Sequence, residues 1–257
     1  MELTDALQFS HDDRKDIYEY VERHGSVRPS EVRRALNFEP GAFGHHLTVL
    51  KRDGYVREED DRLQVAFQES VAEEYETEDL AFTVRQARQG DIDGLSRVVR
   101  SVAEEGSYIE AETVADVIDH ERVVTRHNQV RSRLFFVATV GEDGGSGADA
   151  GADADGEIVG WVHLDMPEAE KLAHTAVLTV GIDPDYRGHG VGSALLQRGM
   201  DWARERGFEK LYNSIPSTNE GAIEFLEAHG WVTEAVRHDH YRVDDEYADE
   251  VMMAVEL

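Results

Sequence analysis

The stretch LTVGIDPDYRGHGVGSALL (178–196) constrains the fold of this 257-residue chain more than any other segment. Its apolar beginning predicts a strand, which enters a glycine-rich turn and then a helix. Gly188, Gly190 and Gly192 lack side chains where the backbone must approach a ligand, so the amides of residues 188–193 can point at an anion. The N-terminus of the helix adds a partial positive charge. We therefore expect a cradle for a pyrophosphate group.

Two other phosphate-binding loops do not fit this stretch. A Walker A loop needs a Gly-Lys-Ser/Thr sequence after the turn, and none follows here. A Rossmann fingerprint takes three glycines in GxGxxG spacing and follows the first strand of its domain. The cradle is therefore of another kind.

The order Arg187-x-x-Gly190-x-Gly192, with Pro184-x-Tyr186 before it, resembles the pyrophosphate motif of the GNAT superfamily of acyl-CoA-dependent N-acyltransferases. A second hallmark of that family is an Asn followed by an apolar helix and a Gly-aromatic pair, which is similar to NEGAIEFLEAHGW (219–231). The resemblance covers about 82–257. It implies a mixed-sheet α/β acyl-CoA N-acyltransferase fold.

The resemblance also implies roles for individual residues. Val180 and Ile182 would hold the acyl carbonyl and the pantetheine arm through backbone groups, and Asn219 would bind the CoA arm. The pyrophosphate would lie on Arg187, Gly188, His189, Gly190, Val191, Gly192 and Ser193. The implied reaction moves an acetyl group from acetyl-CoA to a primary amine by direct attack of the amine.

The chain departs from the family where a general acid is usual. Many members have Tyr seven residues after the motif Asn, and this chain has Leu226. Substitutes are Tyr212, Tyr241 and Tyr247, among which we take Tyr241 as the candidate. For a general base the neighbouring strands offer His163, Asp165 and His174, and His174 is the candidate, with an ordinary surface or packed role as its alternative.

The acceptor is less defined. Glu104, Glu105, Tyr108 and Glu110 lie where the family usually shapes its acceptor pocket, and an acidic rim would suit a cationic amine, a small molecule or a protein N-terminus. The alternative is that these are surface charges. His238 and His240 face one side of a strand without further ligands nearby, so we expect no metal.

Residues 1–70 predict a second, smaller unit. Helices are expected at 14–25, at 28–37 and within 43–56, the third ending near Gly54. Two short strands within 55–67 follow, which completes a winged helix-turn-helix plan. The pattern HLxxLxxxGxV that begins at His46 resembles the recognition helix and wing of winged-helix regulators. Residues 28–57 carry six basic and three acidic side chains, which favours DNA contact. Four acidic residues at the wing tip oppose it, and protein docking or dimerisation is the alternative.

The remaining elements predict an α/β domain at 81–257. Residues 71–80 are acidic and are expected to be a linker, and the low-complexity residues 141–157 are expected to be a disordered loop. Strands are expected at 82–88, 133–140, 157–164, 173–182, 208–215, 231–243 and 249–257. Helices are expected at 90–105, 112–128, 190–207 and 219–230.

Charge limits the partners and the setting. The chain has 54 acidic against 26 basic residues, with only 4 Lys among the basic ones, and it has no Cys. A net charge of −28 opposes general binding to nucleic acid or an anionic membrane. The acidic, Lys-poor composition is similar to that of proteins from salt-accumulating halophiles. No apolar run approaches about 20 residues and the N-terminus is acidic, so we expect a cytoplasmic protein.

Three functions follow from these observations. The first is an acyl-CoA-dependent N-acetyltransferase with an appended winged-helix module. The second is a transcription regulator that senses acetyl-CoA without turnover, which Leu226 favours and the acidic wing opposes. The third is an interaction module that binds no CoA, which the complete glycine motif opposes. The sequence leaves a homodimer open.

Overall fold

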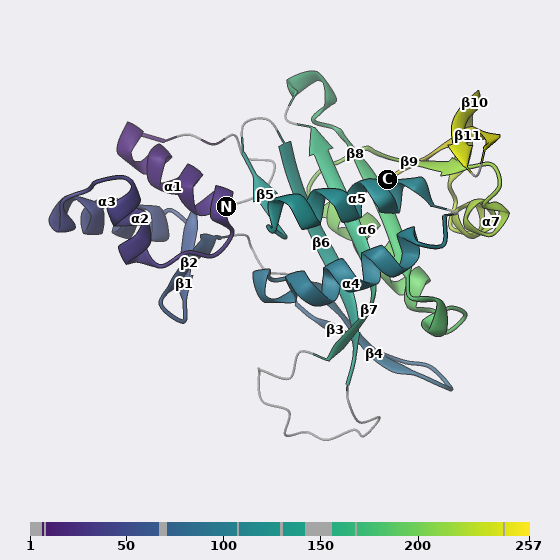
Figure 1. Cartoon of the computed structure of the whole chain (residues 1–257), viewed down its shortest axis with the longest axis horizontal. Coiled ribbons are helices and arrows are strands. Elements are labelled where there is room, and N and C mark those ends of the chain that lie inside the picture. Colours follow the sequence, from purple (N-terminus) through teal and green to yellow (C-terminus); the bar gives the residue numbers. More distant parts are fainter. Residues whose placement is uncertain are drawn as a thin grey trace.

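The computed structural model describes residues 7, 9–66, 71–106, 108–128, 131–141, 156–167, 169–243 and 245–257. Their buried apolar side chains form two clusters, a smaller one within residues 17–65 and a larger one within residues 82–255. Figure 1 shows the N-terminal helices on one side and a large sheet with its own helices on the other. Each part therefore has its own hydrophobic core.

The N-terminal unit consists of three helices and a hairpin. These are α1 (Asp12–His24), α2 (Pro29–Ala35), α3 (Pro40–Arg52), β1 (Val56–Glu59) and β2 (Arg62–Val65). Pro29 and Pro40 begin their helices, where a missing N–H costs no hydrogen bond. Val27 joins the hairpin through backbone hydrogen bonds with Leu63. The elements follow the predicted order, and the winged-helix interpretation stays a prediction.

The C-terminal part is a mixed α/β fold, as predicted. Its sheet has the strand order β10-β11-β9-β8-β7-β6-β4-β3, with β5 beside β6. The strands are β3 (Glu73–Glu76), β4 (Ala81–Gln86), β5 (Arg126–His127), β6 (Arg131–Val140), β7 (Glu157–Pro167), β8 (Thr175–Ile182), β9 (Lys210–Pro216), β10 (Val232–Val243) and β11 (Glu246–Glu256). The helices are α4 (Ile92–Ala103), α5 (Ile109–Glu121), α6 (Val191–Glu205) and α7 (Glu220–Ala228), with 3₁₀ turns η1 (Gln89–Asp91), η2 (Glu170–Leu172) and η3 (Pro184–Tyr186).

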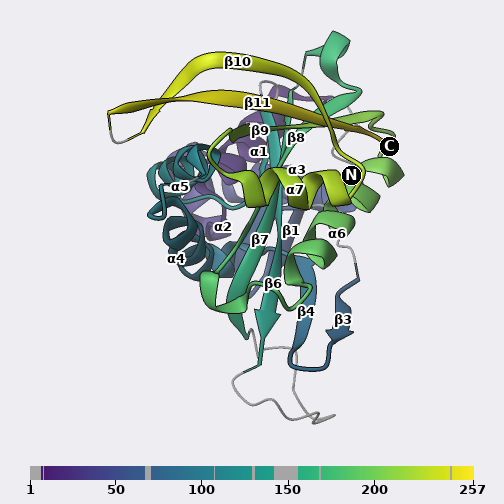
Figure 2. The same ribbon diagram turned by 90° about the vertical axis from the view of Figure 1, so that its right-hand side faces the viewer.

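Helices cover both faces of this sheet. Figure 2 shows α4 and α5 together on one side and α6 on the other. The central strand β7 is buried almost throughout, because its alternate side chains, such as Trp161 and Val162, contact opposite helix layers. On α4 the buried residues Leu95, Val98, Val99 and Val102 form the apolar stripe that faces the sheet.

Two predictions about the borders of this fold need correction. Residues 71–80 are not only a linker, because Glu73–Glu76 forms the edge strand β3, paired with β4. Tyr75 stacks on Phe82, and charged side chains suit an edge strand, where they discourage pairing with other chains. Helix α5 begins at Ile109, inside a segment expected to be a loop, and ends at Glu121. Most of the predicted loop 141–157, residues 142–155, lies outside the described residues.

Polar contacts join the two parts of the chain at the C-terminal end of α5. Nη1 of Arg126 lies 3.1 Å from Oε2 of Glu22 in α1, and its Nε lies 2.9 Å from Oε2 of Glu121 in α5. The buried hydroxyl of Tyr18 donates a hydrogen bond of 2.8 Å to the carbonyl of His127. Helix α1 is therefore attached to the larger part through charges and hydrogen bonds.

Along the described ranges, no helix has the length and apolar character that crossing a membrane requires.

Candidate functional site

The candidate site lies where two parallel strands separate. Strands β8 and β9 pair only from Thr175–Lys210 to Val177–Tyr212, and beyond Val177 no pairing continues. A cleft of about 620 Å³ opens there. Its lining residues are Val102, Glu105, Tyr108, Val180, Gly181, Ile182, Arg187, Gly188, Gly190, Gly192, Ser193, Asn213, Ile215, Asn219, Gly221, Ala222, Phe225 and Leu226. The volume suits a small-molecule ligand.

One end of the cleft is the glycine-rich turn that the sequence singled out. Gly188 and Gly190 have φ angles of +83° and +82°, a conformation that residues with side chains rarely adopt. Gly190 is the N-cap of α6, so the amides of Val191, Gly192 and Ser193 belong to the first turn, where N–H groups have no intrahelical acceptor. The turn therefore presents backbone donors and a helix dipole to an anion.

Gly192 keeps space open inside this turn. A Cβ there would lie 3.5 Å from Ile182 and 3.5 Å from Phe225 of α7, an ordinary contact. A side chain at position 192 would therefore not clash with the protein, but it would occupy part of the cleft that Gly192 lines. Next to it, the hydroxyl of Ser193 lies 3.0 Å from Nε2 of His229.

Arg187 connects the turn to the opposite wall. Its Nε donates to the carbonyl of Ile182 at 3.1 Å, and its Nη2 donates to Oε2 of Glu105 at 2.8 Å. Glu105 follows α4, so the ion pair joins the two sides of the cleft. A bound anion would compete with Glu105 for this guanidinium.

Asn219 holds the start of α7. Its side-chain oxygen accepts a hydrogen bond of 3.2 Å from the amide of Ala222, which makes it the N-cap of that helix. Asn219 and Ala222 both line the cleft. The residue therefore has a structural role in addition to the ligand contact expected for it.

Tyr108 brings a buried hydroxyl to the cleft. It is 6% exposed, and its hydroxyl donates to Oδ1 of Asn213 at 3.2 Å. Burial, together with the charge of Glu110, raises the pKa of Tyr108 well above its ordinary value, although hydrogen bonding with Asn213 and with the Val180 backbone opposes this. The phenol therefore keeps its proton at neutral pH.

A second polar group lies beyond β9, on β10 and β11. Burial and the carboxylates of Glu250 and Glu110 raise the pKa of Tyr241 well above its ordinary value. The buried Glu250 pairs with Arg237 at 2.6 Å. Burial first, and then the charge of Glu250, raise the pKa of Glu110. Glu110 follows Tyr108 by two residues, so this group adjoins the cleft.

Most of the residues predicted for the cofactor line the cleft, namely Val180, Ile182, Arg187, Gly188, Gly190, Gly192, Ser193 and Asn219. His189 and Val191 are not among its lining residues, and Val191 is buried in the core. Leu226, which stands at the usual Tyr position, is in the lining and almost fully buried.

The structure does not bring His174 to the cleft. It is exposed and precedes β8, whereas the cleft opens at the other end of that strand. At about 3.3 Å per residue, His174 lies roughly 20 Å along the strand from Val180. We therefore assign His174 no part in the chemistry of the cleft.

Sequence reasoning missed Asn213 and Ile215 of β9 and Phe225 of α7, which line the cleft. For Asn213 and Ile215 the signal was the strand 208–215 itself, because a strand that separates from its neighbour exposes its last residues to the gap. It could be used only after the parallel pairing of β8 with β9 was known.

The whole arrangement has counterparts among known proteins. Residues 117–231 match the profile of the acetyltransferase (GNAT) family. The match covers less than half of the chain and shows what this segment is similar to. In structure, the chain resembles a GCN5-related N-acetyltransferase from Kribbella flavida with a TM-score of 0.53 and 21% identity, over 68% of this chain and 98% of that one. It resembles a Salmonella typhimurium protein solved with acetyl-CoA with a TM-score of 0.51 and 17% identity, over 68% and 94%.

Relatives by sequence are similar over about a third of this chain. The Escherichia coli K12 ribosomal protein bS18-alanine N-acetyltransferase is 29% identical over 86 residues, 34% of this chain and 58% of that protein. The N-alpha-acetyltransferase RimI of Mycobacterium tuberculosis is 29% identical over 93 residues, 36% of this chain and 57% of that one. The chain thus spans somewhat more than half the length of these relatives.

Proposed function

We propose that this chain is an acetyl-CoA-dependent N-acetyltransferase that acts on a primary amine. The observation that carries the proposal is the cleft at the separation of β8 from β9, which ends in the Gly188–Gly192 turn and the N-terminus of α6. A thioester arm fits between the strands while its diphosphate reaches the turn. The GNAT family match supports the same assignment.

In this proposal the cofactor lies along the cleft from the turn to Tyr108. The amides of the first turn of α6 and Arg187 would hold the pyrophosphate, and Arg187 would exchange Glu105 for a phosphate oxygen. The β8 backbone at Val180 and Ile182 would pair with the pantetheine arm, because β9 leaves that edge of β8 free. His189 and Val191 would contribute through their backbones alone.

The reaction would be a direct transfer. The lone pair of a neutral amine attacks the thioester carbonyl, a C–N bond forms, and the C–S bond breaks to release the CoA thiolate. The nitrogen loses one proton and the thiolate gains one, so the charges balance. Backbone N–H donors aimed at the developing oxyanion contribute about 10²–10³ in rate per donor in other enzymes.

Tyr108 is our candidate for the acid that protonates the thiolate. Its hydroxyl lies inside the cleft, and its raised pKa keeps the proton on the phenol. Tyr241, the candidate from the sequence, is the second choice, because it lies among the acceptor-side residues and does not line the cleft. Leu226 provides no proton.

Glu110 is our candidate for the base. A carboxylate with a raised pKa takes a proton from an ammonium more readily than an ordinary one. The negative charges of Glu110 and Glu250 on this side would favour a cationic amine, carried by a small molecule or a protein N-terminus. The named relatives that act on a ribosomal protein alanine support a primary amine.

The proposal is tested by titrating acetyl-CoA into the protein in about 2 M KCl, which screens its charge, and following thiol release with a panel of amines. Gly190→Glu should abolish binding by placing a side chain and a negative charge in the cradle. Gly207→Glu is the matched control, because Gly207 has a φ of +79° and lies past the other end of α6. Equal transfer by Gly190→Glu and wild type would refute the proposal.

For the N-terminal unit we propose DNA contact through residues 28–57. The alternative to an enzyme is then a transcription regulator whose acetyltransferase-like part senses acetyl-CoA. Arg28 and Arg34 are exposed, which supports contact, whereas Lys51 pairs with Glu58 and Arg57 with Gln64. Sequence-preferring DNA binding without thiol release would favour the sensor. The extent of the two domains, a homodimer, a halophilic surface and a cytoplasmic location stay proposals based on the sequence.

A further inference from the structure

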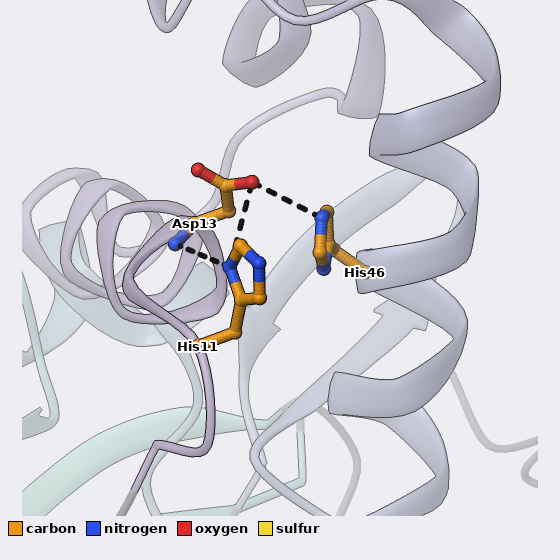
Figure 3. Close-up of side chains that lie close together, drawn as sticks. All are labelled: His11, Asp13 and His46. Carbon is orange, nitrogen blue, oxygen red and sulfur yellow. Dashed lines mark hydrogen bonds and ion pairs between the residues drawn. The ribbon is translucent and has the colours of Figure 1, made fainter.

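Three side chains that bind metals in many proteins meet in the N-terminal unit, far from the cleft. His11 precedes α1, Asp13 lies in its first turn, and His46 comes from α3. Their ligand atoms all lie within 4.8 Å of one another. Figure 3 shows the two imidazoles facing the same carboxylate. The described residues contain no other group of three that is this close.

The distances fit a small cation. Oδ2 of Asp13 lies 3.2 Å from Nε2 of His46 and 3.5 Å from Nδ1 of His11. Ligands at about 2.0–2.1 Å from a tetrahedral ion lie about 3.3 Å apart. Both distances are close to that value, and the remaining pair of ligand atoms lies within 4.8 Å, so side-chain movement has to bring the two imidazoles closer together.

His46 is prepared to act as a ligand. It is 8% exposed, and its Nε2, the atom that would bind the ion, faces the Asp13 carboxylate.

The simpler explanation of these contacts covers only part of them. Nδ1 of His11 accepts a hydrogen bond from the amide of Asp13 at 3.2 Å, which caps α1. Asp13 and His46 could then form a single hydrogen bond between α1 and α3. That account does not explain why the two imidazole rings, 4.8 Å apart, face the same carboxylate. A bound ion would replace the Asp13 amide at Nδ1 of His11.

We propose that His11, Asp13 and His46 bind one divalent transition-metal ion of the zinc class, with water completing the coordination. Two imidazoles and one carboxylate suit Zn²⁺ and Co²⁺ rather than Mg²⁺ or Ca²⁺. The acidic residues Asp12 and Asp13 offset the positive end of the α1 dipole. The ion would fix the start of α1 to α3, and it has no part in acetyl transfer.

The test uses the full chain after chelator treatment, in molar KCl, with Zn²⁺ or Co²⁺ added alone. We expect one equivalent to bind, visible absorption bands from Co²⁺, and a higher unfolding temperature with Zn²⁺. His46→Gln and His11→Ser should each weaken binding at least tenfold. The serine can still cap α1, so His11→Ser removes only the ligand.

His45→Ala is the matched control, because His45 is the exposed neighbour of His46 on the same helix. It should bind Co²⁺ like the wild type. The proposal is overturned if the wild type binds no stoichiometric ion, or if His11→Ser binds as tightly as the wild type. Circular dichroism of each variant shows whether the helices are intact, and should His46→Gln fail to fold, His11→Ser decides.

Discussion

Arg187 and Glu105 form an ion pair of 2.8 Å between the two walls of the cleft. The pair occupies the guanidinium that a ligand's phosphates would use. Both side chains are partly exposed, so the pair contributes modestly and can open. Glu105 thus holds Arg187 in place in the empty cleft and would compete with a ligand's phosphate for the guanidinium.

Glu105→Gln should therefore tighten acetyl-CoA binding. The substitution frees Arg187 and removes a negative charge near the phosphates. An exposed ion pair contributes about 0.2–1 kcal/mol, so the gain should be roughly up to fivefold. Calorimetric titration measures it, and the gain should shrink as KCl is raised. Glu104→Gln, an exposed neighbour outside the lining, should change little. Weaker binding by Glu105→Gln would mean that the carboxylate organises the cradle.

Tyr108→Phe should slow acetyl transfer with little effect on acetyl-CoA binding. Loss of a general acid costs about 10²–10⁴ in rate, so kcat should fall within that range while KM for acetyl-CoA changes less. Thiol release under saturating amine measures both constants. Tyr247→Phe is the control, because Tyr247 is highly exposed. A normal kcat in Tyr108→Phe together with a low one in Tyr241→Phe would return the role to Tyr241.

The rate of transfer should fall as the pH drops through the raised pKa of Glu110. Protonated Glu110 cannot accept the proton of the amine. Glu110→Gln should remove this limb of the pH profile together with much of the rate. A limb that persists in the variant would belong to another group.

Protonation of Glu110 should raise the stability of the protein, the opposite of its effect on the rate of transfer. Because folding raises its pKa, Glu110 contributes stability that is fully present below its unfolded pKa and is lost as the pH rises through its folded pKa. Glu110→Gln should therefore be more stable than the wild type at neutral pH and no more stable at acidic pH. Urea denaturation at the two pH values measures the difference.

The sequence predicted the elements of this fold well because local chemistry sets them. The strand into Gly188 and Gly190, the N-cap Asn219 and the helix start at Pro29 each act within a few residues. Strand β3 was missed because its acidic side chains lack a packing pattern, and only pairing with β4 orders them.

The residues that could be predicted for the site belong to two continuous motifs, the turn 187–193 with the strand before it and the helix start at Asn219. The turn from Arg187 to Ser193 is continuous, so its glycines could be found by their spacing. Tyr108 and Asn213 are 105 positions apart, and only the sheet brings the hydroxyl to the amide. The prediction of His174 as a base was wrong for the same reason. Its place beside β8 in the sequence does not tell which end of that strand faces the gap.

Arg126 should be the residue on which attachment of the N-terminal unit depends most. It pairs with Glu22 of α1 and Glu121 of α5 and is largely buried. Breaking a buried ion pair costs about 3–5 kcal/mol, and here Glu22 would lose its counter-charge while Glu121 keeps Arg133 at 2.7 Å. Arg126→Ala should lower the free energy of unfolding by roughly the smaller of these values, and limited proteolysis should then cut between the two parts.

Arg204→Ala is the control, because its pair with Asp201 is half-exposed on α6 and should cost less than about 1 kcal/mol. Helix α5 runs from the cleft at Tyr108 to Glu121, so the Arg126 variant should also show whether attachment affects acetyl transfer. Equal stability of Arg126→Ala and Arg204→Ala would mean that the Tyr18–His127 hydrogen bond and apolar contacts hold α1 without Arg126.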